Sequence, residues 1–305
     1  MNFDGIYTPA ITPLNAANEI DKAAFAEVLE HLIAGGVHGI IIGGSTGEYY
    51  SHTPQERLEL ASLAKQVIGN RLPLVIGTGA TRTEDSVKYA EAAKEIKADA
   101  ILVTTPPYAL PTERENAEHA LTIDRAAGLP IMLYNYPGRM GVQMGREYFD
   151  IVTSKSKNIA AIKESTGLTS QLHLLACEYP SIQLACGWDD QALEFFAWGA
   201  RSWVCAGSNF VPQEHVALYE ACVVEKDFDK GRQIMSAMLP LMDFLEGGKF
   251  VQSIKSGCKQ AGLRPGGVRA PLQPLNEAEE AALNTIVNEL KRNVASVATR
   301  KHVAA

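Results

Sequence analysis

The sequence of 305 residues lacks the features that mark several large classes of protein. No apolar run approaches the ~18 residues of a membrane-spanning helix, and no basic cluster precedes an apolar stretch at the N-terminus, so we expect neither a membrane protein nor a secreted one. The five cysteines include no CxxC pair, which favours a reducing, cytoplasmic compartment. The net charge is -7 and no basic block is present, so nucleic acid is not an expected partner.

Motifs for common cofactors are also missing. No GxGxxG opens a helix after the first apolar segment, and the glycine-rich GGSTGE (43–48) lacks the Gly-Lys-Ser/Thr ending of a nucleotide P-loop. The seven histidines show no HExxH or other paired spacing. We therefore predict no metal and no cofactor, and a small molecule as the main partner.

Short apolar segments alternate with longer segments of helical periodicity, which is the pattern of parallel βαβ units. Eight such segments are the number that closes a (β/α)8 TIM barrel, an α/β fold. An open doubly wound sheet is the rival fold. The predicted strands are 5–8, 39–42, 74–76, 100–103, 131–134, 159–162, 182–185 and 202–205.

The pattern changes after the eighth strand. Residues 212–245, 249–262 and 276–294 have helical periodicity, and no further strand is evident. We predict the barrel through strand eight over residues 1–211. The last barrel helix and a C-terminal helical appendage are predicted over residues 212–305.

Polar side chains gather just after the predicted strands, where a parallel barrel places its active site. GGSTGE follows the second strand, residues 104–108 follow the fourth, and residues 207–209 follow the eighth. The fifth strand ends at Tyr134 and the sixth is followed by Lys163. One mouth of the barrel is expected to collect them, with GGSTGE as a small-anion site or as a tight turn without a ligand.

Lys163 is a candidate nucleophile, because an apolar strand, IAAI, leads directly to it. At an ordinary pKa of about 10.4, roughly one lysine amine in a thousand is neutral at pH 7.4, so a nucleophilic lysine needs burial. The alternative is a structural ion pair. Tyr134 and Tyr108 could act as acid or base, or could be packing residues with a satisfied hydroxyl.

Four motifs carry a resemblance to a known family. They are GGSTGE at 43–48, TPPYALPT at 105–112, YNYPGRMG at 134–141 and IKEST at 162–166. With these motifs in this order, the chain resembles the dihydrodipicolinate synthase and N-acetylneuraminate lyase family of class I lyases. The resemblance extends over essentially its whole length. The resemblance implies a homodimer or homotetramer that binds a small 2-oxo acid such as pyruvate as a Schiff base.

The resemblance also implies the roles of the candidate catalytic residues. Lys163 is the Schiff-base lysine, and Tyr134 is the acid/base phenol beside it. Ser45 and Tyr108 complete a proton relay, with Tyr108 reaching into the site of the neighbouring subunit.

Further residues are expected to bind the substrate. Ser45 and Thr46, with Gly47 in the same turn, would hold the carboxylate through backbone N–H and hydroxyl groups. Gly187 and Ser208 would complete the pocket from the seventh and eighth strands. Arg139 matches the arginine that holds the second substrate's carboxylate in dihydrodipicolinate synthase, although a solvated loop arginine is its alternative interpretation.

The substrate is less sharply defined, because two features of the motifs disagree. The Ser45–Thr46 pair is the form found in neuraminate lyases, whereas Arg139 matches dihydrodipicolinate synthase and is missing from neuraminate lyases. We favour an enzyme most like dihydrodipicolinate synthase, that is, 4-hydroxy-tetrahydrodipicolinate synthase. The alternatives are a catabolic deaminase or dehydratase, such as 1-pyrroline-4-hydroxy-2-carboxylate deaminase, and a 2-keto-3-deoxy sugar acid aldolase or dehydratase. A non-catalytic ligand-binding barrel is the remote alternative.

Overall fold

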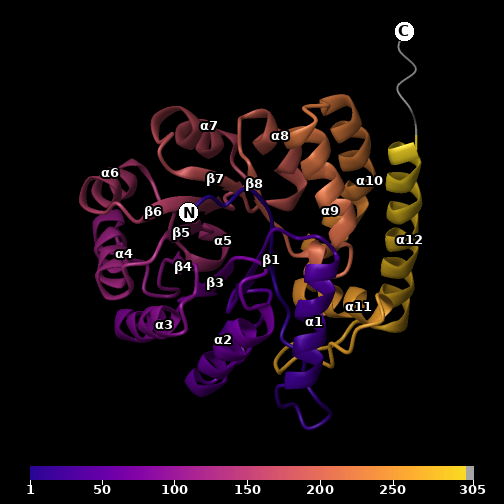
Figure 1. The fold of residues 1–305 in the computed structure, drawn as a ribbon, viewed down its shortest axis with the longest axis horizontal. Helices are drawn as coiled ribbons and strands as arrows, with labels where there is room; N and C mark the ends of the chain where they lie inside the picture. The colour runs from indigo at the N-terminus through magenta and orange to yellow at the C-terminus, as the bar shows by residue number, and fades with distance from the viewer. Residues whose placement is uncertain (300–305) are drawn as a thin grey trace.

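The computed structural model describes residues 1–299, and its centre is a closed barrel of eight parallel strands (Figure 1). Each strand pairs with the next in chain order, and β8 pairs with β1. Every predicted strand overlaps an observed one, so the (β/α)8 prediction is confirmed and the open doubly wound sheet is excluded. The strands are β1 (Gly5–Pro9), β2 (Gly39–Ile42), β3 (Leu74–Gly77), β4 (Ala100–Thr104), β5 (Ile131–Asn135), β6 (Ile159–Glu164), β7 (Gln183–Cys186) and β8 (Ser202–Val204).

Helices surround the barrel, and further helices come after β8 in the sequence (Figure 1). The first ones begin where the sequence provides caps: Asp21 accepts a hydrogen bond from the backbone of Ala24, and Thr53 forms a capping box with Glu56. The α-helices are α1 (Lys22–Ala34), α2 (Pro54–Ile68), α3 (Thr83–Glu95), α4 (Glu113–Ala127), α5 (Pro137–Met140), α6 (Arg146–Lys155), α7 (Thr169–Glu178), α8 (Ala192–Ala197), α9 (Pro212–Tyr219), α10 (Phe228–Glu246), α11 (Phe250–Gln260) and α12 (Glu277–Thr299). Single turns of other helix types are η1 (Tyr49–Ser51), η2 (Asp189–Gln191), η3 (Gly207–Asn209) and η4 (Glu220–Val224).

Two apolar layers hold the barrel together. The larger one lies between the outward faces of the strands and the helices, whereas a smaller cluster fills the inside of the barrel. Met132 and Ala161 belong to the inner cluster. Because side chains alternate along a strand, Tyr134 and Lys163, two residues further on, also point into the barrel.

The chain after β8 is helical as far as the structure describes it, and α12 packs along α10 at one edge of the molecule (Figure 1). The predicted C-terminal region runs to residue 305, and its residues 300–305 lie outside the described part of the chain. Within residues 1–299, none of the helices combines the length and the apolar composition that crossing a bilayer requires.

A buried ion pair ties the C-terminal helices to the barrel mouth. Lys255 of α11 places its Nζ 2.5 Å from Oε1 of Glu48, and both side chains are almost fully buried. The same Nζ donates a hydrogen bond of 2.6 Å to the carbonyl oxygen of Gly267. Glu48 ends the GGSTGE turn with a left-handed backbone, φ +59°. The appendage therefore supports the turn that was predicted to bind an anion.

Replacing one partner of this pair should cost far more stability than replacing both. Lys255→Met is expected to lower the free energy of unfolding by about 3–5 kcal/mol, because it leaves the Glu48 carboxylate buried without a counter-charge. Adding Glu48→Gln should restore part of that loss. Urea unfolding of the wild type and of the single and double variants measures both effects. A single variant as stable as the wild type would contradict the assignment.

Candidate active site

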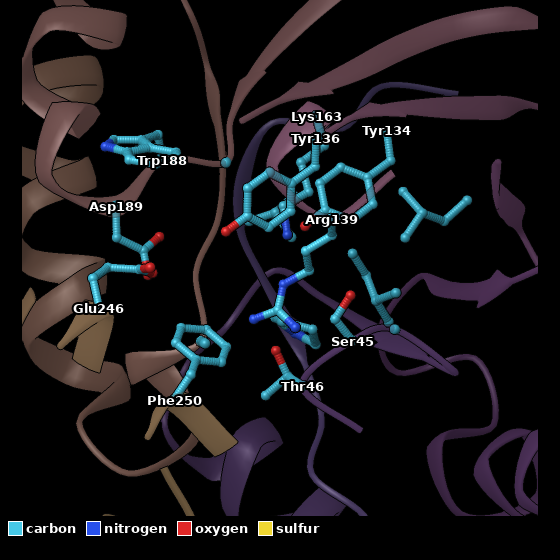
Figure 2. Close-up of a pocket in the computed structure, with 17 residues that line it drawn as sticks. Ser45, Thr46, Tyr134, Tyr136, Arg139, Lys163, Trp188, Asp189, Glu246 and Phe250 are labelled. Atoms are coloured by element: carbon cyan, nitrogen blue, oxygen red, sulfur yellow. The ribbon is translucent and has the colours of Figure 1, made fainter. Parts of the chain in front are cut away.

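A cavity opens at the carboxyl ends of the barrel strands, the end at which parallel barrels carry their active sites (Figure 2). Six of the predicted site residues line it: Ser45, Thr46, Tyr134, Arg139, Lys163 and Gly187. Its other lining residues are Pro9, Ile41, Gly44, Leu102, Tyr136, Trp188, Asp189, Val204, Ala206, Glu246 and Phe250.

Lys163 is held at the floor of this cavity by the register of two strands. Tyr134 of β5 and Lys163 of β6 are directly paired, and the lysine Nζ lies 4.3 Å from the centre of the tyrosine ring. The Lys163 side chain is buried, and this burial lowers its pKa, against the opposing effects of Asp189 and Cys205. Burial favours the neutral amine, which is the nucleophilic form.

Tyr134 is a buried phenol that remains protonated at neutral pH. Burial raises its pKa well above the ordinary value, and the nearby Arg139 charge and the hydroxyls of Ser165 and Ser45 act in the opposite direction. The phenol therefore starts as a proton donor. Ser45 is close enough to interact with it, which brings together two of the three predicted relay residues.

The glycine-rich turn after β2 presents Ser45 and Thr46 to the cavity, while Gly47 faces away from it. A Cβ atom at Gly47 would lie 2.7 Å from the carbonyl oxygen of Ala10. The carbonyl of Gly47 accepts a hydrogen bond of 2.9 Å from the hydroxyl of Thr12. Glycine at this position thus allows the turn to pack on the segment that follows β1, and the residue is not among those that line the cavity.

Gly187 makes room for the lysine. A Cβ atom there would lie 2.6 Å from Cγ and 2.8 Å from Cε of Lys163, closer than real side chains allow. Any larger residue after β7 would displace the Lys163 side chain. The absence of a side chain at Gly187 is therefore a geometric condition for the position of the amine.

Ser208 and Tyr108 lie outside the cavity in the single chain. Ser208 is fully buried below it, where its hydroxyl donates to the carbonyl of Cys205 and shares a 2.7 Å hydrogen bond with the hydroxyl of Thr8. Tyr108 sits in the loop after β4 with a left-handed backbone, φ +72°, and is 95% exposed. An exposed tyrosine can reach a reaction centre only in another subunit or after the loop moves.

Arg139 reaches the cavity from the short helix α5 (Figure 2). Its guanidinium carbon lies 5.6 Å from the ring centres of both Tyr136 and Phe250. These contacts hold the guanidinium at the opening of the cavity, where the residue is still exposed to solvent. A planar guanidinium at this place suits a carboxylate on the substrate.

The most informative residues that the sequence did not single out are two acids, Asp189 and Glu246. Asp189 is buried, and its Oδ1 accepts a hydrogen bond of 2.9 Å from the indole N–H of Trp203. Burial raises its pKa to about 7, although the Trp203 hydrogen bond and Lys163 oppose the shift. Its position right after strand seven was a usable signal. Glu246 comes from α10, and no local pattern links it to the barrel mouth.

Within residues 1–299, no group of three or more His, Cys, Asp or Glu side chains is arranged to hold a metal ion. The five cysteines are free thiols. Burial raises the pKa of both Cys186 and Cys205 well above the ordinary value, so neither supplies a thiolate near Lys163.

Comparison with known proteins places these features in a family. The family model described as "Dihydrodipicolinate synthetase family" matches residues 2–290. A protein of Exiguobacterium sibiricum named 4-hydroxy-tetrahydrodipicolinate synthase is 33% identical over 282 residues, which are 92% of this chain and 96% of the relative.

Solved structures agree with the sequence comparison. The 4-hydroxy-tetrahydrodipicolinate synthase of Methylacidiphilum fumariolicum superposes with a TM-score of 0.92 at 29% identity, covering 97% of this chain and 99% of its own. A prophage protein of the dihydrodipicolinic acid synthase family from E. coli K12, solved in complex with pyruvate, has a TM-score of 0.90 at 28% identity and coverages of 95% and 99%.

The match extends over nearly the whole length of the chain and of its relatives, and the lysine, the phenol and the serine–threonine turn meet in one cavity. The chain therefore belongs to the dihydrodipicolinate synthetase family and is an enzyme of the class I lyase type.

Proposed function

We propose that Lys163 forms a Schiff base with the ketone of pyruvate and that the resulting enamine adds to the aldehyde of a second substrate. The observation that carries this proposal is the buried amine of Lys163, 4.3 Å from the ring centre of Tyr134 in a cavity at the barrel mouth. The names of the relatives support 4-hydroxy-tetrahydrodipicolinate synthase as the reaction.

The first half of the cycle uses residues of one chain. The neutral amine of Lys163 attacks C2 of pyruvate, and loss of water leaves a protonated Schiff base that withdraws electrons from C3. The substrate carboxylate lies against the Ser45–Thr46 turn, whose fixed donors need no rearrangement during the reaction. Tyr134 and Ser45 carry the protons, and removal of a C3 proton gives the enamine.

The second half requires a second substrate at the outer part of the cavity. The enamine C3 attacks the aldehyde carbon, and Arg139 pairs with the carboxylate that aspartate semialdehyde would present. Tyr108 completes the relay from a neighbouring subunit of a homodimer or homotetramer, as its 95% exposure in the single chain allows. We place the enzyme in the cytoplasm.

A dehydratase or deaminase acting on a hydroxylated 2-oxo acid or a cyclic imine is the second candidate. The observation in its favour is the pair of acids, Asp189 and Glu246, on the side of the cavity away from Ser45 (Figure 2). Acidic groups accommodate hydroxyl or amino groups of a substrate better than a second carboxylate, which would meet like charge.

Borohydride reduction in the presence of pyruvate should add one covalent adduct to Lys163. Lys163→Ala should remove the adduct, because Lys163 is the one lysine among the described residues that line the cavity. Lys157→Ala is the matched control, since Lys157 is an exposed residue just before the same strand. Intact-protein and peptide mass spectrometry measures the modification. An unmodified wild type, or an equally labelled Lys163→Ala, would disprove the Schiff base.

The two candidate reactions are separated by their substrates. Pyruvate with aspartate semialdehyde should give condensation with a higher kcat/KM than 1-pyrroline-4-hydroxy-2-carboxylate gives for ammonia release. Arg139→Met should weaken condensation by raising KM for the semialdehyde roughly 10-fold or more, because a hydrogen bond between charged groups is worth about 1.5–3 kcal/mol.

Efficient ammonia release with negligible condensation would reverse this choice. Arg139 would then order the loop over the substrate, and Arg139→Met would change both kcat and KM for the pyrroline.

A further inference from the structure

Glu164 is a buried carboxyl group to which the cycle above gives no role. It is the last residue of β6 and directly follows Lys163. Because side chains alternate along a strand, Lys163 points into the barrel and Glu164 points to its outer face, where it is 1% exposed. A glutamate is almost never buried so deeply unless its oxygens are paired, so its role follows from its partners.

Each oxygen of Glu164 accepts a hydrogen bond from a fixed donor. Oε2 accepts one of 2.8 Å from Nδ2 of Asn135, the residue paired with Glu164 on the neighbouring strand β5. Oε1 accepts one of 2.6 Å from the backbone N–H of Thr166. Burial raises the pKa of Glu164 to about 7, and these hydrogen bonds oppose the shift because they favour the carboxylate. The ionised side chain can only accept hydrogen bonds.

Asn135 transmits this constraint to the loop that carries Arg139. Since Nδ2 of Asn135 faces Glu164, its Oδ1 points the other way and accepts a hydrogen bond of 3.0 Å from the N–H of Met144. Met144 comes nine residues after Asn135, so this hydrogen bond closes the loop between them. Tyr136 and Arg139, which both line the cavity, belong to this closed loop.

The far end of the loop is held at both backbone groups of Met144. Nε2 of Gln171, a buried residue of α7, donates a hydrogen bond of 2.9 Å to the carbonyl oxygen of Met144, and the Met144 side chain is fully buried. The contact at the N–H depends on the orientation of the Asn135 amide. Glu164 sets that orientation, because its carboxylate requires a donor from Asn135.

We propose that Glu164 is a positioning residue, which orients the Asn135 amide and thereby holds the loop that presents Arg139 to the second substrate. The part that concerns the second substrate rests on the proposed function. Glu164 acts through Asn135 and not on the reacting atoms. Its loss should therefore leave the Schiff base at Lys163 intact and weaken the second half of the cycle.

Glu164→Gln tests this role, because it replaces one acceptor oxygen by an amide donor of nearly the same shape. The new amide group faces either Nδ2 of Asn135 or the N–H of Thr166, and in both cases two donors oppose each other. Adding Asn135→Asp exchanges the carboxylate and the amide between the two strands. The exchange restores a donor–acceptor pair and leaves an acceptor for the N–H of Met144, so the double variant should recover what the single variant loses.

Amide hydrogen exchange, read by peptide mass spectrometry at a pH above the pKa of Glu164, reports on the loop directly. Residues 136–144 should exchange ~5-fold or more faster in Glu164→Gln than in the wild type, because one unsatisfied buried group corresponds to at least that factor. The double variant should return to the rate of the wild type. KM for aspartate semialdehyde should follow the same pattern, whereas KM for pyruvate and the borohydride adduct at Lys163 should stay unchanged.

Glu91→Gln is the matched control, because Glu91 is an exposed residue of α3 and its substitution should change neither the exchange of the loop nor KM. Three results would overturn the inference: unchanged exchange of the loop in Glu164→Gln, exchange that rises equally in every strand of the barrel, or no recovery in the double variant. A wild type that does not condense pyruvate with the semialdehyde would instead refute the proposed function. The exchange measurement would still decide whether Glu164 holds the loop.

Discussion

The burial of one amine is the constraint on which the rest of the site depends. A lysine in water is charged and unreactive toward ketones, and removing it from water is costly unless it loses its proton. The closed barrel provides the necessary enclosure, because its inner cluster fills the space below Lys163 and Tyr134 covers one side of the amine. Because Gly187 has no side chain, it leaves space for the aliphatic part of the Lys163 side chain.

The other charged groups of the cavity lie around this amine with donor groups on one side and acidic groups on the other. Arg139 and the Ser45–Thr46 turn offer positive or donor groups to carboxylates, while Asp189 and Glu246 form an acidic wall on the far side. A substrate that bridges the two is oriented with its carboxylate away from the acids. This asymmetry of charge favours one orientation of a substrate carboxylate, and the Lys255–Glu48 ion pair stabilises the Ser45–Thr46 turn from the side of the C-terminal helices.

The strands and helices of the barrel could be predicted from the sequence, because they depend on local periodicity. Strand alternation with helices was enough to find the barrel, and because the carboxyl ends of its parallel strands meet at one mouth, Tyr134 and Lys163 could be expected to lie there together. Their direct pairing is known only from the structure. Ser208 shows the limit of this approach, since a side chain after a strand can point into the core as well as into the mouth. Glu246 and Phe250 come from α10 and α11, and the packing of these helices over the mouth has no local signature. Tyr108 is an exposed loop residue in the single chain. The relay role proposed for it needs a neighbouring subunit or a movement of the loop, and the sequence pattern specifies neither.

The most direct measurement of the central claim is the titration of Lys163 itself. Competitive labelling with acetic anhydride over a range of pH, read by peptide mass spectrometry, compares Lys163 with the exposed Lys157 in the same sample. The account predicts that Lys163 becomes reactive at a lower pH than Lys157, because burial lowers the pKa of its amine. Identical titration of the two lysines near the ordinary value of about 10.4 would contradict the claim that the barrel holds a neutral amine.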